Sequence, residues 1–188
     1  VPYCEVVRPH DTEQFIHLTP HADHAEVASA VALLPHTTTS LGVTVSTGRV
    51  VDFRAKDHLR PQPGENTVPL VYPTHMAEGT ICWPKESRKS NALVRCPETE
   101  NLLLPAGGYV LVKRFSAKEE RRRVVASLVR EGDLPGDGWA FENHLNVFHS
   151  SNRGLPPALA AGLAVWLNST VVDVAFRQFS GHTQVNAT

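Results

Sequence analysis

The sequence predicts an α+β domain, in which a mainly antiparallel β-sheet lies between an N-terminal helix and a C-terminal helical segment. Short apolar runs bounded by proline or glycine recur between residues 41 and 148, which is typical of strands joined by turns. Longer segments with apolar residues at helical spacing flank this region on both sides. With 188 residues the chain is long enough to form one domain with its own core.

The composition is that of a globular protein with a loop-rich surface. Apolar residues make up 41% and charged residues 20% of the chain, and 14 prolines and 12 glycines indicate many turns. The net charge is −1, so binding to a polyanion would require a local cluster of Lys and Arg. The overall charge is therefore mild evidence against a nucleic-acid-binding protein.

The cysteines, the hydropathy and the chain ends bear on the compartment of the protein. Three cysteines without a C-x-x-C spacing argue against a disulfide framework and fit a reducing cytoplasm. No apolar run approaches the roughly 18 residues that a membrane span needs, and no signal peptide is present. We therefore predict a cytoplasmic protein without a membrane partner. The start at Val1 and the stop at Thr188 predict a piece excised from a longer protein.

The first predicted elements lie in the N-terminal part of the chain. Residues 1–20 are interpreted as an entry segment or linker, with a short strand at the apolar run 15–18. A helix is predicted over 22–34, because its alanines, valines and leucines fall on one helical face. Pro35 ends that helix, since proline cannot continue the hydrogen-bond ladder.

Residues 41–54 predict a β-hairpin. Valines alternate with polar residues on its first strand, and residues 46–49 form its turn. Gly48 suits a backbone conformation with positive φ in that turn. Arg49 would then lie at the tip of the hairpin, and Arg54 at its far end.

Three short strands are predicted next, at 68–72, 79–83 and 92–94. A proline directly follows each of the first two, and proline ends strand pairing because it has no N–H to donate. The basic loop 85–91 lies between the second and the third of these strands.

The stretch from Gly107 to Arg130 is the most informative part of the sequence. Its apolar run over 109–112 predicts a buried strand. Six of the 18 Lys and Arg residues of the chain then fall between Lys113 and Arg123. A buried strand that ends in a cluster of cations presents that charge at the surface, where it can neutralise a polyanion such as DNA.

Residues 116–129 have two interpretations. Ser116 with Glu119 fits a capping box, and the apolar residues that follow fit a helical stripe, which favours a helix. The alternative is a hairpin with a turn over 116–120 and a strand over 121–129. The local pattern slightly favours the helix.

The last part of the chain predicts one strand and a helical segment. Residues 139–148 predict a strand that carries the polar stretch 142–144. Residues 155–179 predict a helix, which Asn168-Ser169 breaks into two. The polar tail after Gly181 is not expected to be helical.

The cation cluster that follows the predicted buried strand also has two interpretations. Lys and Arg side chains contact backbone phosphates of DNA and release counterions, which provides affinity without reading the sequence. The alternative is a solvated charged face that Glu119 and Glu120 partly neutralise. Composition alone favours the second interpretation.

Turns and polar residues elsewhere add candidates that could read bases. An Arg on a turn can fork onto guanine in the major groove, and Asn or Gln can bind adenine in the same bidentate way. Asn and Gly also occupy turns for backbone reasons alone. The candidate DNA-contacting residues are Thr47, Arg49, Arg54, Lys113, Arg114, Ser116, Lys118, Arg121, Asn143, His182 and Gln184.

No catalytic residue and no metal site is predicted. The chain lacks G-x-S-x-G, Walker A, H-E-x-x-H and G-x-G-x-x-G motifs. His17, His21 and His24 are near one another, but zinc needs further ligands at short spacing, often cysteines. A metal-dependent nuclease would need a cluster of acids, which the sequence does not offer.

Three stretches together resemble a known family. They are Val45–Arg54 (VSTGRVVDFR), Tyr109–Arg123 (YVLVKRFSAKEERRR) with Glu142–Phe148 (ENHLNVF), and Gly162–Thr188. In this order they are similar to the C-terminal target-recognition region of adenine-N6 DNA methyltransferases from type II restriction–modification systems. The resemblance extends over roughly residues 40–188. The wider pattern also resembles the target-recognition domains of type I specificity subunits.

The resemblance implies a fold and a division of labour. Related domains are rich in twisted β-structure, which favours the hairpin over the helix at 116–129. The parent enzyme, in a bacterial or archaeal cell, would flip an adenine out of double-stranded DNA and methylate its N6 with S-adenosylmethionine. In that family the cofactor pocket and the catalytic Asn/Asp-Pro-Pro-Tyr/Phe motif lie in an N-terminal methyltransferase domain. Pro156-Pro157 here follows Leu155, so that motif is absent.

The resulting expectation is a single DNA target-recognition domain over residues 1–188. It would bind and orient double-stranded DNA beside the N-terminal methyltransferase domain of the same chain, with no cofactor and no activity of its own. A protein-interaction or scaffold domain, whose charged loop docks a partner subunit, is the alternative function.

Overall fold

The computed structural model describes residues 7, 26–27, 30–31, 33–117 and 119–179 of the chain. They form an α+β fold with mainly antiparallel strands and two helices near the C-terminus, which confirms the predicted fold class. Most of the predicted helix over 22–34 lies outside the described residues, as does the predicted strand at 15–18.

The strands are short and the helices come last. The strands are β1 (Thr44–Thr47), β2 (Leu59–Arg60), β3 (Thr67–Val71), β4 (Met76–Ala77), β5 (Thr80–Ile81), β6 (Ala92–Val94), β7 (Leu103–Pro105), β8 (Tyr109–Lys113), β9 (Ala126–Val129), β10 (Gly138–Phe141) and β11 (Leu145–His149). The α-helices are α3 (Pro157–Leu167) and α4 (Thr170–Phe179), and single 3₁₀ turns occur at Lys56–His58, Pro73–His75 and Glu100–Leu102.

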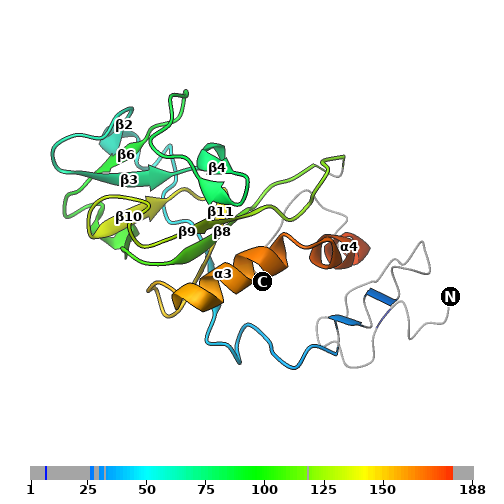
Figure 1. The fold of residues 1–188 in the computed structure, drawn as a ribbon. Helices are drawn as coiled ribbons and strands as arrows, with labels where there is room; N and C mark the ends of the chain where they lie inside the picture. The colour runs from blue at the N-terminus through cyan, green and yellow to red at the C-terminus, as the bar shows by residue number, and fades with distance from the viewer. Residues whose placement is uncertain (1–6, 8–25, 28–29, 32, 118, 180–188) are drawn as a thin grey trace.

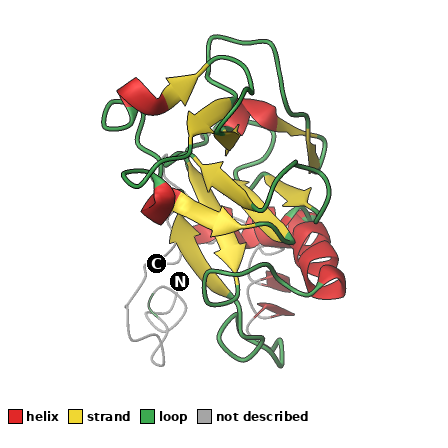
Figure 2. Cartoon of the chain, turned by 90° about the vertical axis from the view of Figure 1, so that its left-hand side faces the viewer, coloured by secondary structure: helices red, strands yellow, loops and turns green. Residues whose placement is uncertain are grey.

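Two larger sheets and one small one organise these strands. The first has four antiparallel strands in the order β1-β11-β8-β9, and the second has five in the order β2-β6-β3-β10-β7. Among the described strands, β10 and β3 are the pair that runs parallel. The strands β4 and β5 form a separate two-stranded sheet. Figure 2 shows the strands at the centre of the molecule, with loops around them.

The core is layered because successive side chains of a strand point to opposite faces. On β8, Val110 and Val112 pack in a cluster with residues of α3, which lies along β8 and β9 (Figure 1). Tyr109 and Leu111 point the other way, into a cluster that includes Trp139 of the second sheet. The strand β8 is therefore buried on both faces, which explains its uninterrupted apolar sequence.

The predicted hairpin over 41–54 is wrong. The strand β1 pairs with β11, far along the chain, and Val50 forms a parallel bridge with Glu142. Gly48 is buried, and a Cβ atom there would lie 2.1 Å from the carbonyl oxygen of Glu142. This glycine therefore allows a close backbone approach and does not serve a turn with positive φ. Alternation indicated a strand correctly, but it carries no information about the partner strand.

The pairing of β8 with β9 confirms the hairpin, with its second strand beginning at Ala126 and not at residue 121, and shows that the helix over 116–129 is wrong. Tyr109 pairs with Val129, and Val112 pairs with Ala126. The hydroxyl of Ser116 accepts a hydrogen bond from Nε of Arg123 (3.0 Å) instead of capping a helix. Non-local strand pairing thus overrides the local capping signal.

The predicted strand over 139–148 is two strands in two different sheets. The strand β10 lies in the five-stranded sheet and β11 lies in the four-stranded sheet. Residues 142–144 connect them, and the amide of Leu145 donates to the carbonyl of Glu142 (3.0 Å). The polar stretch that the sequence placed within one strand therefore forms the turn where the two sheets meet.

The predicted break in the C-terminal helix is confirmed. Asn168 lies between α3 and α4, and its Nδ2 donates to the carbonyls of Ala164 and Ala126, each at 2.9 Å. Its Oδ1 accepts from the amide of Ala126 (3.1 Å), which fastens the break to β9. Within the described residues no single helix is long and apolar enough to cross a membrane; α3 and α4 pass that test only as a pair, bent by 60°.

Asp173 fastens α4 to the connection between β8 and β9. Its Oδ1 accepts hydrogen bonds from the backbone amides of Arg123 (2.6 Å) and Val124 (3.2 Å). Its Oδ2 accepts one from Nε of Arg177 (2.8 Å). Burial acts to raise the pKa of Asp173, but the hydrogen bonds from Arg177 and the two amides outweigh burial, so this pKa lies below its usual range.

Replacing Asp173 with Ala should lower the free energy of unfolding by roughly 2–4 kcal/mol near neutral pH, because two amides and a guanidinium lose their acceptor. Since the folded-state pKa is lowered, this stabilisation is complete above the unfolded-state pKa of about 4. It is lost as the pH falls through the folded-state value. Chemical denaturation of the wild-type and D173A chains at about pH 7 and about pH 3 should show the difference shrinking at the lower pH.

Asp57 provides the matched control, because its side chain is exposed. The D57A change should cost less than about 0.5 kcal/mol. Equal losses from D57A and D173A would contradict the role of Asp173.

Candidate nucleic-acid interface

A cleft of about 300 Å³ opens where the two larger sheets meet. It lies between the end of β8, the turn from β10 to β11, the residues that follow β3 and the basic loop 85–91. The residues that line it are Tyr72, Pro73, Thr74, Lys89, Lys113, Phe115, Glu142 and His144.

A hydrogen-bonded network forms one wall of this cleft. The hydroxyl of Tyr72 donates to Oδ1 of Asp52 (2.6 Å), and Nζ of Lys89 forms an ion pair with Oδ2 of the same carboxylate (2.8 Å). The ammonium of Lys89 also lies 4.9 Å from the centre of the Tyr72 ring. Burial and the hydrogen bond to Asp52 raise the pKa of Tyr72, so this hydroxyl keeps its proton. The network holds Lys89 at the edge of the cleft.

The carboxylate of Glu142 and the imidazole of His144 also line the cleft. Glu142 is only 1% exposed, and its Oε2 accepts a hydrogen bond from the backbone amide of His144 (2.9 Å). Its Oε1 is hydrogen-bonded to Nδ1 of His144. The His144 ring packs against Phe115, with a centroid distance of 5.2 Å. The cleft therefore presents a fixed imidazole next to an aromatic ring.

Two arginines each lie against an exposed phenylalanine. The guanidinium of Arg114 lies 5.6 Å from the centre of the Phe115 ring, and that of Arg54 lies 5.5 Å from the Phe53 ring. Phe53 is 77% exposed, which is unusual for a side chain of its size. It directly follows Asp52, the residue that forms the ion pair with Lys89. Aromatic rings and guanidinium groups both stack on nucleic-acid bases.

The cations at the end of β8 are available for binding. Lys113 lines the cleft, and Nη1 of Arg114 donates a single hydrogen bond, 3.3 Å long, to the carbonyl of Asn143. Neither cation forms an ion pair with any carboxylate in the described part of the chain. Their charge is therefore not neutralised by the described residues and can attract an anion.

The structure brings some of the predicted site residues together. Lys113, Arg114 and Asn143 lie at the same end of the sheets, and Arg54 lies in the turn before Ala55, two residues after Asp52. Arg121 is exposed in the connection between β8 and β9, which projects past the sheets in Figure 1.

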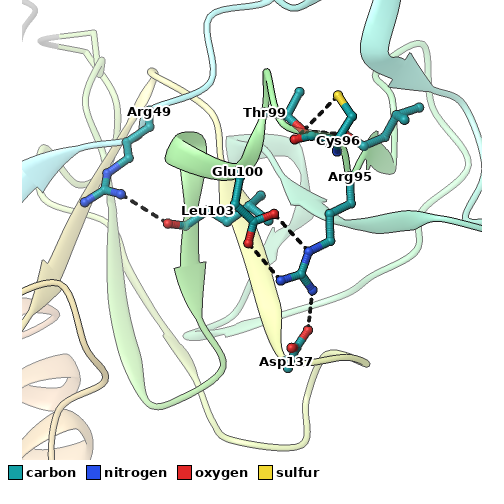
Figure 3. A network of polar contacts seen from close by, with 8 residues as sticks. Arg49, Arg95, Cys96, Thr99, Glu100, Leu103 and Asp137 are labelled. Atoms are coloured by element: carbon teal, nitrogen blue, oxygen red, sulfur yellow. Dashed lines mark hydrogen bonds and ion pairs between the residues drawn. The ribbon is translucent and has the colours of Figure 1, made fainter.

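Other predicted residues are engaged within the protein. Arg49 donates from Nη1 to the carbonyls of Asn101 (3.2 Å) and Leu103 (3.1 Å), and from Nη2 to Oδ1 of Asn152 (2.6 Å). Figure 3 shows its guanidinium turned toward Leu103. Ser116 is buried beneath Arg123. These two residues are not at the cleft.

The remaining predicted residues lie away from the cleft or are not described. Thr47, on β1, pairs with Asn146 on β11, and β11 lies between β1 and β8. Lys118, His182 and Gln184 lie outside the described residues.

Arg95 shows that a surface arginine can be fully occupied. Its guanidinium holds Glu100 (2.9 Å) and Asp137 (2.6 Å), which joins the loop before β7 to the loop before β10 (Figure 3). The hydrogen bonds from Arg95 lower the pKa values of both carboxyl groups. This arginine therefore serves the fold, in contrast to Lys113 and Arg114.

Sequence reasoning missed several residues of the cleft, notably Tyr72, Lys89, Phe115 and His144. A signal existed for Lys89, since the basic loop 85–91 was apparent as a local charge cluster. The aromatic residues carry no such signal, because an aromatic residue is more often part of the core. Among the described residues, no group of three or more His, Cys, Asp or Glu side chains is placed to hold a metal ion.

The arrangement defines a module with a cleft at one end of two sheets, lined by two lysines, one buried carboxylate and aromatic rings. Comparison with known proteins shows which proteins this chain resembles. The chain is 43% identical over 189 residues to the type II methyltransferase M.PstI of Providencia stuartii. It is 44% identical over 187 residues to the type II methyltransferase M.BsuBI of Bacillus subtilis.

Homologues of this chain are therefore type II methyltransferases, which confirms the resemblance to enzymes of that class. Both alignments cover 100% of the chain, but the chain spans only 37% of the length of each relative. No protein-family model matches the chain, and no solved structure matches it.

Proposed function

We propose that this chain is the DNA target-recognition domain of an adenine-N6 DNA methyltransferase from a type II restriction–modification system. The observation that carries the proposal is the cleft with Lys89, its aromatic rings and Lys113, which forms no ion pair with any described residue. Homology of the whole chain to a part of two type II methyltransferases supports it, because a methyltransferase that acts at one site in DNA needs a surface that grips the duplex.

The geometry suggests how double-stranded DNA is held. Lys113, Lys89 and Arg114 contact backbone phosphates, which positions the duplex over the cleft. The Phe53–Arg54 and Phe115–Arg114 pairs flank the contact and provide flat, cationic surfaces for bases that leave the stack. The turn 142–144 brings Glu142 and His144 to the cleft, and in this proposal base edges are read there.

Methyl transfer belongs to another part of the parent protein in this proposal. The Asn/Asp-Pro-Pro-Tyr/Phe motif is absent from the sequence. Among the described residues, no glycine-rich turn joins a parallel strand to a helix, the arrangement that typically holds a nucleotide-type cofactor. We therefore assign S-adenosylmethionine to an N-terminal methyltransferase domain of the same chain, acting in the cytoplasm. The 188-residue chain alone should transfer no methyl group to DNA.

Selection from a pool of randomised duplexes tests the proposal. The purified chain, incubated with the pool at low salt and recovered through several rounds, should enrich one short sequence, because a target-recognition domain contacts base edges as well as phosphates. The same selection with single-stranded DNA serves as the comparison and should enrich none. A pool that stays random, or the absence of any binding to duplex DNA, would overturn the proposed function.

A protein-interaction function is the second candidate, and one observation favours it. The outer side of α3 is apolar, with Val165 75% exposed and Trp166 36% exposed. Exposed apolar surface of this kind marks contact sites for other proteins. Salt separates the two functions: an apolar contact persists at high salt, whereas phosphate contacts weaken steeply.

A further inference from the structure

We propose that His144, oriented by Glu142, reads a base of the target by accepting a hydrogen bond from its exocyclic amino group. The ligand class is an amino-bearing base edge, adenine N6 or cytosine N4. The inference rests on the proposed function and names the base chemistry that the same cleft recognises. It makes His144 a specificity-determining residue and Glu142 a positioning residue.

The Glu142 carboxylate is buried. A carboxylate that is 1% exposed is costly unless hydrogen bonds compensate the loss of water. Both of its oxygens are bound by the same residue, Oε2 by the backbone amide of His144 and Oε1 by Nδ1 of its ring. The described hydrogen bonds of the buried Glu142 carboxylate therefore all hold His144 in place.

The bond to Glu142 determines which ring nitrogen of His144 carries the hydrogen. A carboxylate has no proton to donate, so Nδ1 of His144 carries the hydrogen of the bond to Glu142. In the neutral ring the other nitrogen, Nε2, then has a free lone pair and can only accept a hydrogen bond. Without the carboxylate either nitrogen could carry the proton, and the ring would present no defined chemistry.

The His144 side chain is accessible to a ligand in the cleft. Despite the burial of its partner, the His144 side chain is 52% exposed, and it lines the cleft. The Phe115 ring packs against the imidazole, which limits its rotation. In its neutral form the imidazole is therefore an ordered acceptor at the surface, and such pre-organised groups discriminate between ligands more effectively than mobile ones.

The bases differ in the hydrogen-bonding groups that their edges present. In the major groove adenine and cytosine present amino donors, whereas guanine and thymine present carbonyl acceptors at the corresponding positions. An acceptor at Nε2 pairs with the first two and opposes the lone pairs of the second two. The neighbouring Lys113 and Arg114 provide only donors, so His144 adds the complementary function to this surface.

Base analogues test this inference. The duplex recovered by selection is synthesised with one adenine at a time replaced by purine, which lacks the N6 amino group, or one cytosine by pyrimidin-2-one, which lacks N4. The wild-type chain should lose roughly fivefold to fiftyfold in affinity at one position. The H144F variant keeps a flat ring against Phe115 but has no acceptor, so it should bind the natural duplex more weakly and show no further loss at that position.

The E142Q variant tests the positioning role separately. An amide can donate as well as accept, so it no longer fixes the proton on Nδ1 of His144, and the discrimination against the analogue should fall several-fold while the ring remains. An H144Q variant, whose side-chain oxygen restores an acceptor, should recover part of the discrimination that H144F loses.

Two results would overturn the inference, and they are distinguishable. If wild-type and H144F chains lose the same affinity at every substituted position, His144 reads no amino group, although sequence-specific binding by the domain still stands. If the wild-type chain has no preferred duplex at all, the proposed function fails and the inference fails with it. A H144F chain with unchanged thermal unfolding excludes misfolding as the reason for its binding profile.

Discussion

The K113E/R114E double variant is expected to bind duplex DNA roughly tenfold to a hundredfold more weakly than the wild-type chain, by a similar factor for every sequence. Both residues lie at the end of β8, and neither forms an ion pair with a described carboxylate. Their removal from the contact with phosphate should also reduce the slope of log affinity against log salt by about 2. Fluorescence anisotropy with a labelled duplex at several salt concentrations measures both quantities.

The R130E/R153E double variant is the matched control, because it changes the net charge of the chain by the same amount. Both arginines are exposed, and they follow β9 and β11 at the opposite end of the four-stranded sheet. This variant should lose less than about threefold, since a remote charge acts only through a screened field. Equal losses from the two double variants would show that overall charge and not the cleft determines the affinity.

Replacing Gly48 with Ala is expected to have the largest effect on stability, a loss of roughly 3–5 kcal/mol in the free energy of unfolding. A Cβ atom at this position would lie 2.1 Å from the carbonyl oxygen of Glu142 and 2.7 Å from that of Phe141. Both are backbone atoms, which cannot rotate away as a side chain would. The segment around Gly48 would have to separate from the turn 142–144. This separation would also break the hydrogen bond from the amide of Gly48 to the carbonyl of Leu145 (2.8 Å).

Gly64 offers the comparison, because a Cβ atom there would meet nothing within 4 Å. The G64A chain should unfold within about 1 kcal/mol of the wild type. Urea denaturation of the three chains measures the losses. A G48A chain as stable as G64A would contradict the close contact between this segment and the turn that carries His144.

Local sequence patterns predicted most of the elements, because burial on both faces or helical spacing is a local property. The strands β3, β6 and β8 lie where short apolar runs predicted them, and the break at Asn168 follows from its capping chemistry. The partners of the strands could not be predicted in the same way. The alternation before Gly48 indicated a strand, but the pairing of β1 with β11 depends on contacts between distant segments.

The candidate site was predictable to the same extent. Lys113 and Arg114 were found because a local run of charge follows a buried strand. Lys89 and His144 were not, since strand pairing and the second sheet bring them to the same cleft. For Arg49 the residue type was suggestive, but three acceptors of the protein occupy its guanidinium, which the sequence does not reveal.

The salt dependence of DNA affinity tests the central claim most directly. In the proposed function Lys89, Lys113 and Arg114 contact phosphates of the duplex. Log affinity should then fall linearly with log salt between about 50 and 200 mM, with a slope steeper than about −2. An affinity that does not change over this range, or no binding to any duplex at the lowest salt, would contradict the assignment of this face to DNA.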